Sequence, residues 1–536
     1  MATIWGEDIG GWTFRSGRGD FHHIRTGAAS RGGVPTLDEP LPAESAVPGS
    51  IPVLRKARMS QRTVPATRRV LGVVAALVVA AALATWAYAW ADFIGLDYRV
   101  YRMGGQSVVD GDGSLYTRSF GEGEGSLLFT YPPFAALAFT ALTLVSAETG
   151  AVLFVGLSVL IAAATSFLIT RYLGGFRSVR AVVGHPSALP LAIAGTGLVC
   201  LLGPWRETMA FSQVNILLFA MIAADLLSGP HRRLPTGLLT GIAAGIKLTP
   251  LVFGLYFLAR GEWKQLFTMA AGFFGTIALG FLLLPAESAT YWLQMLRDTG
   301  RIGGEGYVDN LSIRGAILHV MGPDFPSTVP WLIISLLLVA GTTYVIRTAK
   351  QRGDRFLPMA MTALLMLLIS PISWSHHWVW IVVVLAVLAG QAAGLPAELK
   401  AYRTTAAVLF VSTLVVFIYS PKTIGLLFGA VDLNSQLTTG WLVASSAGVV
   451  CALATTVFWV LLSRIPAPLS TAGRAAPGAG ADGGGTGGED VVSEYARPDD
   501  PLPEDTARHH AHGDVAPDDA RQDGAYDGVE PGTRRR

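Results

Sequence analysis

The sequence is poor in charged residues and in cysteine, and each shortage excludes a class of protein. Only 15% of its 536 residues are charged and 51% are hydrophobic, whereas a soluble domain carries about a quarter charged residues. The two cysteines, Cys200 and Cys451, lie inside apolar runs, so they provide neither a disulfide framework nor a cysteine-rich zinc site. The net charge of +2 provides no basic face for nucleic acid. This composition indicates a membrane protein.

The charges that are present concentrate at the two ends of the chain. Residues 1–69 hold 10 basic and 6 acidic side chains, and residues 466–536 hold 7 and 14. Both ends are rich in Gly and Pro and lack apolar periodicity, so folding would not offset their ordering entropy. We expect disordered cytoplasmic tails over 1–69 and 466–536, the second one acidic, around a membrane domain over 70–465. The first apolar run begins near Val70, too late for a cleaved signal peptide.

The apolar runs predict an all-α, polytopic transmembrane helix bundle. Ten windows are long enough to cross a hydrocarbon core of about 30 Å, namely 70–90, 150–170, 188–204, 209–227, 265–285, 329–346, 357–373, 377–394, 404–420 and 439–463. Two more stretches are ambiguous, because 131–146 opens with two prolines and 236–259 is interrupted by Lys247-Leu248-Thr249-Pro250. If 131–146 is a surface helix and 236–259 a hairpin of two short helices, every basic loop is cytoplasmic, as the positive-inside rule requires. We therefore predict ten full spans and one re-entrant hairpin, or up to twelve helices.

This topology places a multi-pass protein in the plasma membrane with both termini in the cytoplasm. The longer polar loops, 91–149, 286–328 and 421–438, then lie on the outer face, where we expect the active site. Asp97 lies a few residues beyond the first span, and a carboxylate between water and apolar protein can serve as a general base. The alternative is an interfacial carboxylate paired with Arg99 or Arg102.

Two other segments carry side chains suited to binding an anion. Lys247 is the single charge inside the hairpin stretch, where an ammonium is costly unless it is paired or hydrated. A phosphate would provide that partner beside the backbone N–H groups of a helix break, although the lysine could instead extend to an interface. His376 and His377 are flanked by Trp374 and Trp378, a cluster suited to a phosphate or sugar, or to an aromatic belt. Adjacent histidines with no third ligand do not predict a zinc site.

Other polar residues carry weaker signals. Asp110-Gly111-Asp112 matches a cation-binding Asp-x-Asp pattern, but it is first of all a turn signal, and we predict no metal site. Gln213 and Asn215 could join neighbouring helices. Asn310 and Arg314, in the loop 286–328, could contact a glycan or a phosphate, or order that loop.

Six segments, taken in order, resemble glycosyltransferase family 87 of the polytopic GT-C class, which uses lipid-phosphate sugars. They are Asp97-Tyr98-Arg99-Val100-Tyr101, Tyr131-Pro132-Pro133-Phe134, Gln213-Val214-Asn215, Ile246-Lys247-Leu248-Thr249-Pro250, Asn310-Leu311-Ser312-Ile313-Arg314-Gly315 and Ser370 through Trp378. The resemblance covers roughly 70–465 and implies a GT-C-like bundle. It also implies transfer of mannose from polyprenyl-phosphate mannose on the outer side of the membrane, forming α-1,2 linkages on mannosylated lipids or lipoglycans of actinobacteria.

The resemblance also implies roles for individual side chains. A β-linked donor and an α-linked product require inversion, with Asp97 as the base and cations stabilising the departing phosphate. Lys247, Arg314 and one of His376 or His377 would stabilise the phosphate. Trp374 or Tyr131 would lie near the sugar or prenyl chain, and Asn310 would help to bind the donor. The scheme needs no metal or other cofactor.

Two other functions remain open at this point. A related enzyme could use another polyprenyl-phosphate sugar such as arabinofuranose, because helix-bundle transferases share an architecture while their sugar pockets differ. A transporter or flippase would also suit an intramembrane lysine at a helix break. Transporters usually show internal repeats, and the two halves of this chain show no convincing pairing.

Overall fold

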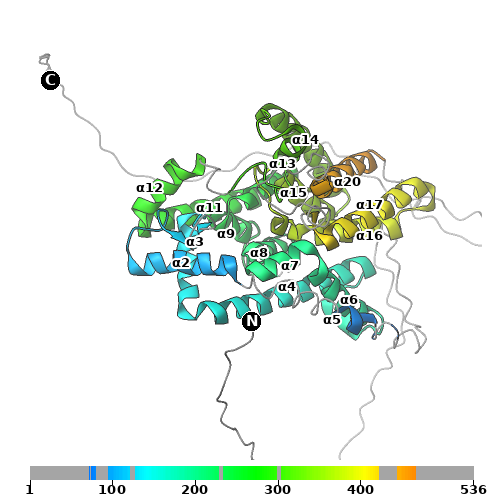
Figure 1. The fold of residues 1–536 in the computed structure, drawn as a ribbon. Helices are drawn as coiled ribbons and strands as arrows, with labels where there is room; N and C mark the ends of the chain where they lie inside the picture. Colours follow the sequence, from blue (N-terminus) through cyan, green and yellow to red (C-terminus); the bar gives the residue numbers. More distant parts are fainter. Residues whose placement is uncertain are drawn as a thin grey trace, which may run out of the picture. The chain divides into compact units, whose positions relative to one another are not determined.

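The computed structural model describes residues 70, 72, 74–79, 95–120, 127–227, 233–297, 303–421 and 444–465. Both predicted tails, 1–69 and 466–536, lie outside these residues. The described chain is almost entirely helical, as predicted (Figure 1). Its one sheet is a two-stranded antiparallel pair, β1 (Ser119–Phe120) and β2 (Leu127–Leu128).

The helices vary widely in length. The α-helices are α2 (Leu96–Asp110), α3 (Pro133–Phe139), α4 (Ala147–Gly174), α5 (Val179–Gly184), α6 (Ala188–Leu201), α7 (Gly203–Phe211), α8 (Asn215–Leu227), α9 (Leu238–Ile246), α10 (Phe253–Ala259), α11 (Trp263–Leu283), α12 (Pro285–Leu293), α13 (Ile313–Met321), α14 (Thr328–Gln351), α15 (Phe356–Ile369), α16 (Ile381–Gly394), α17 (Lys400–Tyr419) and α20 (Ala447–Ser463). The 3-10 helices are η4 (Thr140–Leu144), η5 (Thr249–Val252), η6 (Met295–Arg297), η8 (Ser375–Trp380) and η9 (Ala397–Leu399).

The described helices do not confirm the predicted count of ten spans. Five are long and apolar enough to cross a membrane, namely Ala147–Gly174, Trp263–Leu283, Thr328–Gln351, Ser375–Gly394 and Ala397–Tyr419. A sixth results if α6 and α7, bent by 70° at their junction, count as one span. A continuous apolar run in the sequence can contain a turn, and each helix within it is then shorter than the run. The predicted span 209–227 is divided between α7 and α8, and the predicted span 357–373 contains the 14-residue α15.

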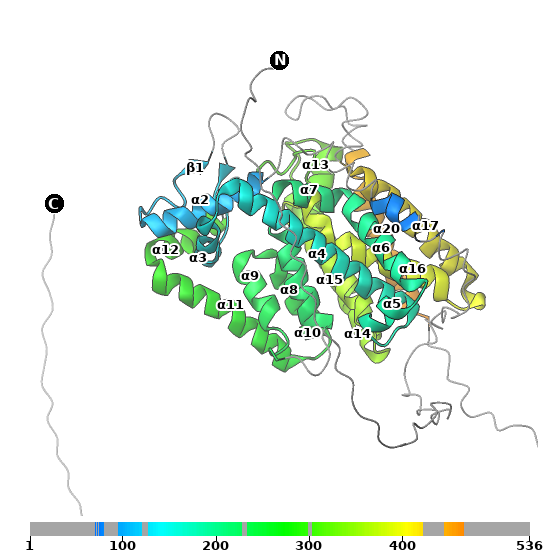
Figure 2. The same cartoon turned by 90° about the horizontal axis from the view of Figure 1, so that it is seen from below.

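The ambiguous stretch 236–259 forms two short helices, α9 and α10, that run in opposite directions. Gly237, Gly241 and Gly245 of α9 pack in order against Gln265, Met269 and Thr276 of α11. These two helices are therefore parallel, and Figure 2 shows them side by side. On α10, Gly254 packs against Leu266, so the chain has turned back by then. The predicted hairpin geometry is thus present, with its turn at Lys247 and η5.

The candidate span Ser375–Gly394, formed by η8 and α16, is the most buried of the five in the described residues. The apolar window of Ser375–Gly394 is 72% buried, whereas those of the other four candidate spans are 17–28% buried. Large apolar side chains on the outer helices remain exposed, among them Leu160 of α4, Phe274 of α11 and Leu337 of α14. Such surfaces suit contact with lipid. The central span begins at η8, which carries both histidines of the predicted cluster.

Candidate functional site

Close packing at the start of α2 positions Asp97. Gly95, the residue before the helix, has a left-handed backbone (φ 80°) and donates its N–H to the Ala210 carbonyl at 2.8 Å. A Cβ on Gly95 would lie 2.6 Å from the Cβ of Ala151, so only glycine allows this approach. Asp97 follows in the first turn of α2, where the helix dipole favours a carboxylate.

A hydrogen-bonded group of tyrosine and glutamine side chains adjoins that carboxylate. Tyr101, one turn further along α2, donates its hydroxyl to Gln213 Oε1 at 2.6 Å. The Tyr131 hydroxyl lies 3.0 Å from the Tyr101 hydroxyl and 3.4 Å from Gln213 Oε1. The Gln213 side chain also lies near Asp97 and lowers the pKa of that carboxyl. The sequence pattern brought Tyr131 forward but not Tyr101, and it suggested Gln213 only as a contact between helices.

The surroundings of Asp97 adjust its proton affinity to the neutral range. Burial raises the pKa of Asp97 to about 6, while the Gln213 side chain and the charge of Lys247 lower it. A carboxylate that titrates just below neutral pH remains a usable base at pH 7. Neither neighbouring arginine is its partner, because Arg99 pairs with Glu148 at 3.4 Å and Arg102 donates to the Val145 carbonyl at 3.0 Å. The alternative of a simple interfacial ion pair therefore does not hold.

Lys247 lies where α9 ends, and polar groups from separate elements hold its ammonium. Nζ donates to Asn215 Oδ1 at 2.9 Å and lies 3.0 Å from Nε2 of His377. It also lies 5.7 Å from the centre of the Tyr131 ring, within reach of a cation–π interaction. Lys247 is thus a paired group inside the bundle, and the alternative of a lysine extending to an interface does not hold.

The hydrogen bonds of His377 determine which nitrogen carries its proton. The backbone N–H of Trp374 donates to Nδ1 at 3.2 Å, so the proton of a neutral ring is on Nε2. That N–H and the Lys247 ammonium, with their nitrogens 3.0 Å apart, are then two adjacent donors that do not bond each other and need a third group to accept from both. Two converging donors favour an anionic acceptor such as a phosphate oxygen.

The break between α7 and α8 places both amides of the site. Ser212 ends α7 with a left-handed backbone (φ 53°), and Gln213 N–H returns to the Thr208 carbonyl at 2.8 Å. Asn215 begins α8, and its amide nitrogen donates to the His376 carbonyl at 3.1 Å. That bond leaves the Asn215 carbonyl oxygen for Lys247. One short turn thus places one amide near Asp97 and another against the ammonium.

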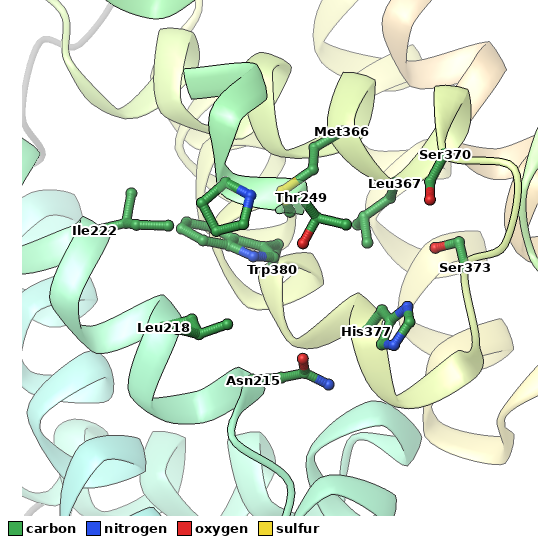
Figure 3. A pocket seen from close by; sticks show the side chains of 11 residues that line it. Asn215, Leu218, Ile222, Thr249, Met366, Leu367, Ser370, Ser373, His377 and Trp380 are labelled. Carbon is green, nitrogen blue, oxygen red and sulfur yellow. The ribbon is translucent and has the colours of Figure 1, made fainter. Parts of the chain in front are cut away.

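A cavity adjoins this lysine–histidine pair. Figure 3 shows Asn215 and His377 on its wall together with apolar side chains of other helices. The lining residues are Asn215, Leu218, Ile222, Thr249, Pro250, Met366, Leu367, Ser370, Ser373, His377 and Trp380. Polar groups therefore border one part of the cavity and apolar ones another, as an amphipathic ligand requires.

His376 faces a different group of side chains from His377. Its ring stands perpendicular to that of His377, with the two centres 4.8 Å apart. Ligand atoms of Glu207, Asp309 and His376 all lie within 4.8 Å of one another, and all three residues are buried. The Ser375 hydroxyl contacts the carboxylates of Glu207 and Asp309. These are side chains that could hold a divalent cation, a grouping that the sequence pattern did not reveal.

Three other predicted donor-binding residues lie in the contact between the loop 286–328 and the Ser370–Trp374 segment. Asn310 is fully buried and donates to the carbonyls of Glu305 at 2.7 Å and Pro371 at 3.0 Å. Arg314 pairs with Glu305 at 2.9 Å. The Trp374 ring packs edge-on against Tyr307, with centres 5.6 Å apart. The structure gives these side chains loop-ordering contacts, and among the predicted residues it joins Asp97, Tyr131, Lys247 and His377.

The Asp-x-Asp segment forms the turn that ends α2. Gly111 has a left-handed backbone (φ 64°), and Asp112 Oδ1 accepts the Ser114 N–H at 2.9 Å. The turn interpretation of this motif is confirmed.

The chain is similar to several known proteins and matches one family model. Two crystal structures of ArnT from Cupriavidus metallidurans, one bound to undecaprenyl phosphate, align with a TM-score of 0.33. The bound form is 19% identical and the alignment covers 72% of this chain and 77% of that one. Residues 129–371 match the model of glycosyltransferase family 87.

Two relatives from Mycolicibacterium smegmatis are more similar in sequence. One is a polyprenol-phosphate-mannose-dependent alpha-(1-2)-phosphatidylinositol pentamannoside mannosyltransferase, 35% identical over 60% of this chain and 76% of its own length. The other, a polyprenol-phosphate-mannose-dependent alpha-(1-2)-phosphatidylinositol mannoside mannosyltransferase, is 34% identical over 55% of this chain and 69% of its own length. With such identity across most of its relatives' length, the chain belongs to glycosyltransferase family 87.

Proposed function

We propose that this protein transfers mannose from polyprenyl-phosphate mannose to a mannosylated lipid or lipoglycan, forming an α-1,2 linkage on the outer face of the plasma membrane. Its relatives are named as polyprenol-phosphate-mannose-dependent α-(1-2)-mannosyltransferases that act on phosphatidylinositol mannosides. The observation that carries the proposal is a single connected site. It contains a carboxylate that titrates near neutral pH, Asp97, and two converging donors, Lys247 and His377.

The reaction is an inverting displacement in one step. Asp97 takes the proton of the acceptor hydroxyl as its oxygen attacks the anomeric carbon of the donor mannose. The bond from that carbon to the phosphate oxygen breaks on the opposite side of the sugar, and the lipid phosphate leaves with the electron pair. Lys247 and the Nε2–H of His377 stabilise the negative charge that develops there. Tyr131 lies between α2 and the ammonium, since its hydroxyl bonds Tyr101 of α2 and its ring lies beside Lys247.

The donor lipid has a path that suits its chemistry. The cavity beside His377 combines polar groups near the ammonium with Leu218, Ile222 and Met366. In our proposal the phosphate binds at Lys247 and His377, and the prenyl chain follows the apolar side of this cavity toward the lipid-facing helices. In an apolar groove the prenyl chain keeps surroundings as apolar as the hydrocarbon core of the bilayer, so its binding buries no unpaired polar group.

We further propose the topology that places the site outside. Ten spans and a re-entrant hairpin put the basic loops, such as 347–356, in the cytoplasm and the Asp97 and His377 loops on the outer face. The disordered tails, 1–69 and 466–536, are then cytoplasmic. The antiparallel arrangement of α9 and α10 supports a hairpin that enters and leaves on the same side.

The experiment that tests the function is transfer by membranes that contain the full chain. Radiolabelled polyprenyl-phosphate mannose is supplied with a mannosylated phosphatidylinositol acceptor, and the lipid products are separated. We expect a labelled product that an exo-α-1,2-mannosidase converts back to its precursor, and none from membranes with Asp97→Asn. Absence of transfer, a product resistant to that enzyme, or preferential use of polyprenyl-phosphate arabinofuranose would overturn the proposal.

A further inference from the structure

We propose that the hydroxyl of Ser373 is a third phosphate contact, which donates a hydrogen bond to an oxygen of the donor lipid phosphate beside Lys247 and His377. The inference rests on the proposed function, because it takes the phosphate to bind at that pair. It adds a residue to which the sequence pattern gave no role, and it defines the end of the cavity at which the phosphate lies.

The Ser373 hydroxyl is buried and unpaired. The residue is 1% exposed, and its Oγ has no hydrogen-bond partner among the residues that the structure describes. A buried hydroxyl without a partner is destabilising, so each instance in a protein needs an explanation. Ser373 lines the cavity, and Figure 3 shows its oxygen directed into the space that the His377 ring also borders. A ligand in this cavity would provide the missing partner.

The backbone of Ser373 is held on both sides. Its N–H donates to Asn310 Oδ1 at 2.9 Å, and its carbonyl accepts the N–H of Leu311 at 2.8 Å. Asn310 and Leu311 are both fully buried. Both backbone groups of Ser373 are therefore paired with the loop 286–328, and its hydroxyl is left for a ligand. A side chain on a backbone that is already fixed loses little further freedom when a ligand binds.

A tight turn joins Ser373 to the histidine of the site. The N–H of Trp374, the next residue, donates to Nδ1 of His377 at 3.2 Å, and the N–H of His377 donates to the Trp374 carbonyl at 2.8 Å. These two bonds fix the histidine ring against the residue that follows Ser373. The hydroxyl and the imidazole thus belong to one ordered segment and border the same cavity, so one ligand can contact both.

The polar groups at this end of the cavity are mainly donors. Lys247 has three N–H bonds, of which Asn215 Oδ1 accepts one, and a neutral His377 carries its proton on Nε2. The other hydroxyl of this segment at the cavity, that of Ser370, donates to the Ile372 carbonyl at 2.7 Å. A sugar hydroxyl must donate as well as accept, whereas a charged phosphate oxygen only accepts. The unpaired hydroxyl therefore suits the phosphate of the donor better than its sugar.

The test is equilibrium binding of polyprenyl phosphate and of polyprenol to the detergent-solubilised full chain. Ser373→Ala removes one oxygen and should weaken binding of polyprenyl phosphate about 10–100-fold, as expected for a hydrogen bond to a charged group. Binding of polyprenol should not change, because the alcohol lacks the phosphate. The Tm without ligand should not fall either, because the hydroxyl bonds nothing in the described chain.

Ser370→Ala is the matched control, with the same substitution in the same segment and cavity. Its hydroxyl bonds the Ile372 carbonyl, so we expect a lower Tm and an affinity for polyprenyl phosphate within about twofold of the unmodified protein. If Ser373→Ala fails to accumulate, Ser373→Cys decides by the same comparison, because a thiol is a weaker donor of similar size.

The outcomes separate the inference from the function. Unchanged affinity of Ser373→Ala for polyprenyl phosphate would refute the contact and leave the hydroxyl to water. An equal loss for polyprenol, or a loss seen only with polyprenyl-phosphate mannose, would also refute it, because the hydroxyl would then affect the prenyl chain or the sugar. These measurements need no transfer. Weakened binding of polyprenyl phosphate in a protein that transfers no mannose would support the contact and reject the function alone.

Discussion

Replacing Asp97 with Asn tests the centre of the proposed mechanism. The amide keeps the shape of the carboxylate, but it cannot take a proton. Loss of a general base typically costs 10²–10⁴-fold in rate, about 3–5 kcal/mol. We expect Asp97→Asn to lose turnover in this range while its donor affinity stays close to that of the unmodified protein.

The pH dependence of the transfer rate gives a second quantitative prediction for Asp97. A base must be deprotonated, and with the pKa of Asp97 raised to about 6, roughly nine tenths of the protein is active at pH 7 and one tenth at pH 5. The rate should therefore fall about tenfold over this interval, and the residual rate of Asp97→Asn should lack this acid limb.

The assay for both magnitudes is initial-rate transfer from radiolabelled polyprenyl-phosphate mannose in membranes, at matched expression and across pH 5–8. Donor affinity is measured separately by competition with the unlabelled lipid. Activity of the Asn variant within a few-fold of the unmodified protein, or a variant that retains the acid limb, would remove Asp97 from the reaction.

Three further predictions concern the phosphate, the loop and the topology. Lys247→Met should weaken donor binding by about 100-fold, whereas His377→Ala should mainly slow turnover, by about 10²–10³-fold; equal binding losses in equilibrium titrations would reject this division. Asn310→Ala should destabilise the detergent-solubilised protein by about 2–4 kcal/mol, seen as a lower Tm, and an unchanged Tm would deny its role in joining the loops. In a variant free of Cys200 and Cys451, an impermeant thiol reagent outside intact cells should label a cysteine at position 112 and spare one at position 352; labelling at 352 would invert the topology.

Charged residues in apolar surroundings could be predicted from the sequence as members of the site. Lys247 is a lone charge in an apolar stretch, and Asp97 is a carboxylate at a predicted membrane exit. Burial of either is costly without partners, so their convergence with Tyr131 and His377 has a physical cause. The hairpin was predictable for a related reason, because Pro250 and the charged Lys247 three residues before it cannot lie within one continuous apolar helix.

Side chains whose role depends on which of their atoms faces a partner could not be predicted from the sequence. Gln213 and Asn215 are ordinary amides on an apolar segment, and their functions follow from which end of each amide meets a donor. Arg314 and Asn310 suggested ligand contacts because arginines and amides suit phosphates and sugars. The structure instead gives Arg314 a carboxylate in its own loop and Asn310 four backbone partners. Spacing along the chain carries no information on such choices.

The contacts of Lys247 explain how one site can contain both a base, Asp97, and a cation, the Lys247 ammonium. Its ammonium contacts two neutral groups, the Asn215 carbonyl and the His377 ring, instead of the carboxylate. A direct ion pair would lower the pKa of Asp97 far below neutral and weaken it as a base, and it would also neutralise the charge meant for the phosphate. At its actual position Lys247 lowers that pKa only partly, so that burial still leaves it at about 6. The site can therefore offer a proton acceptor to one substrate and a positive charge to the other.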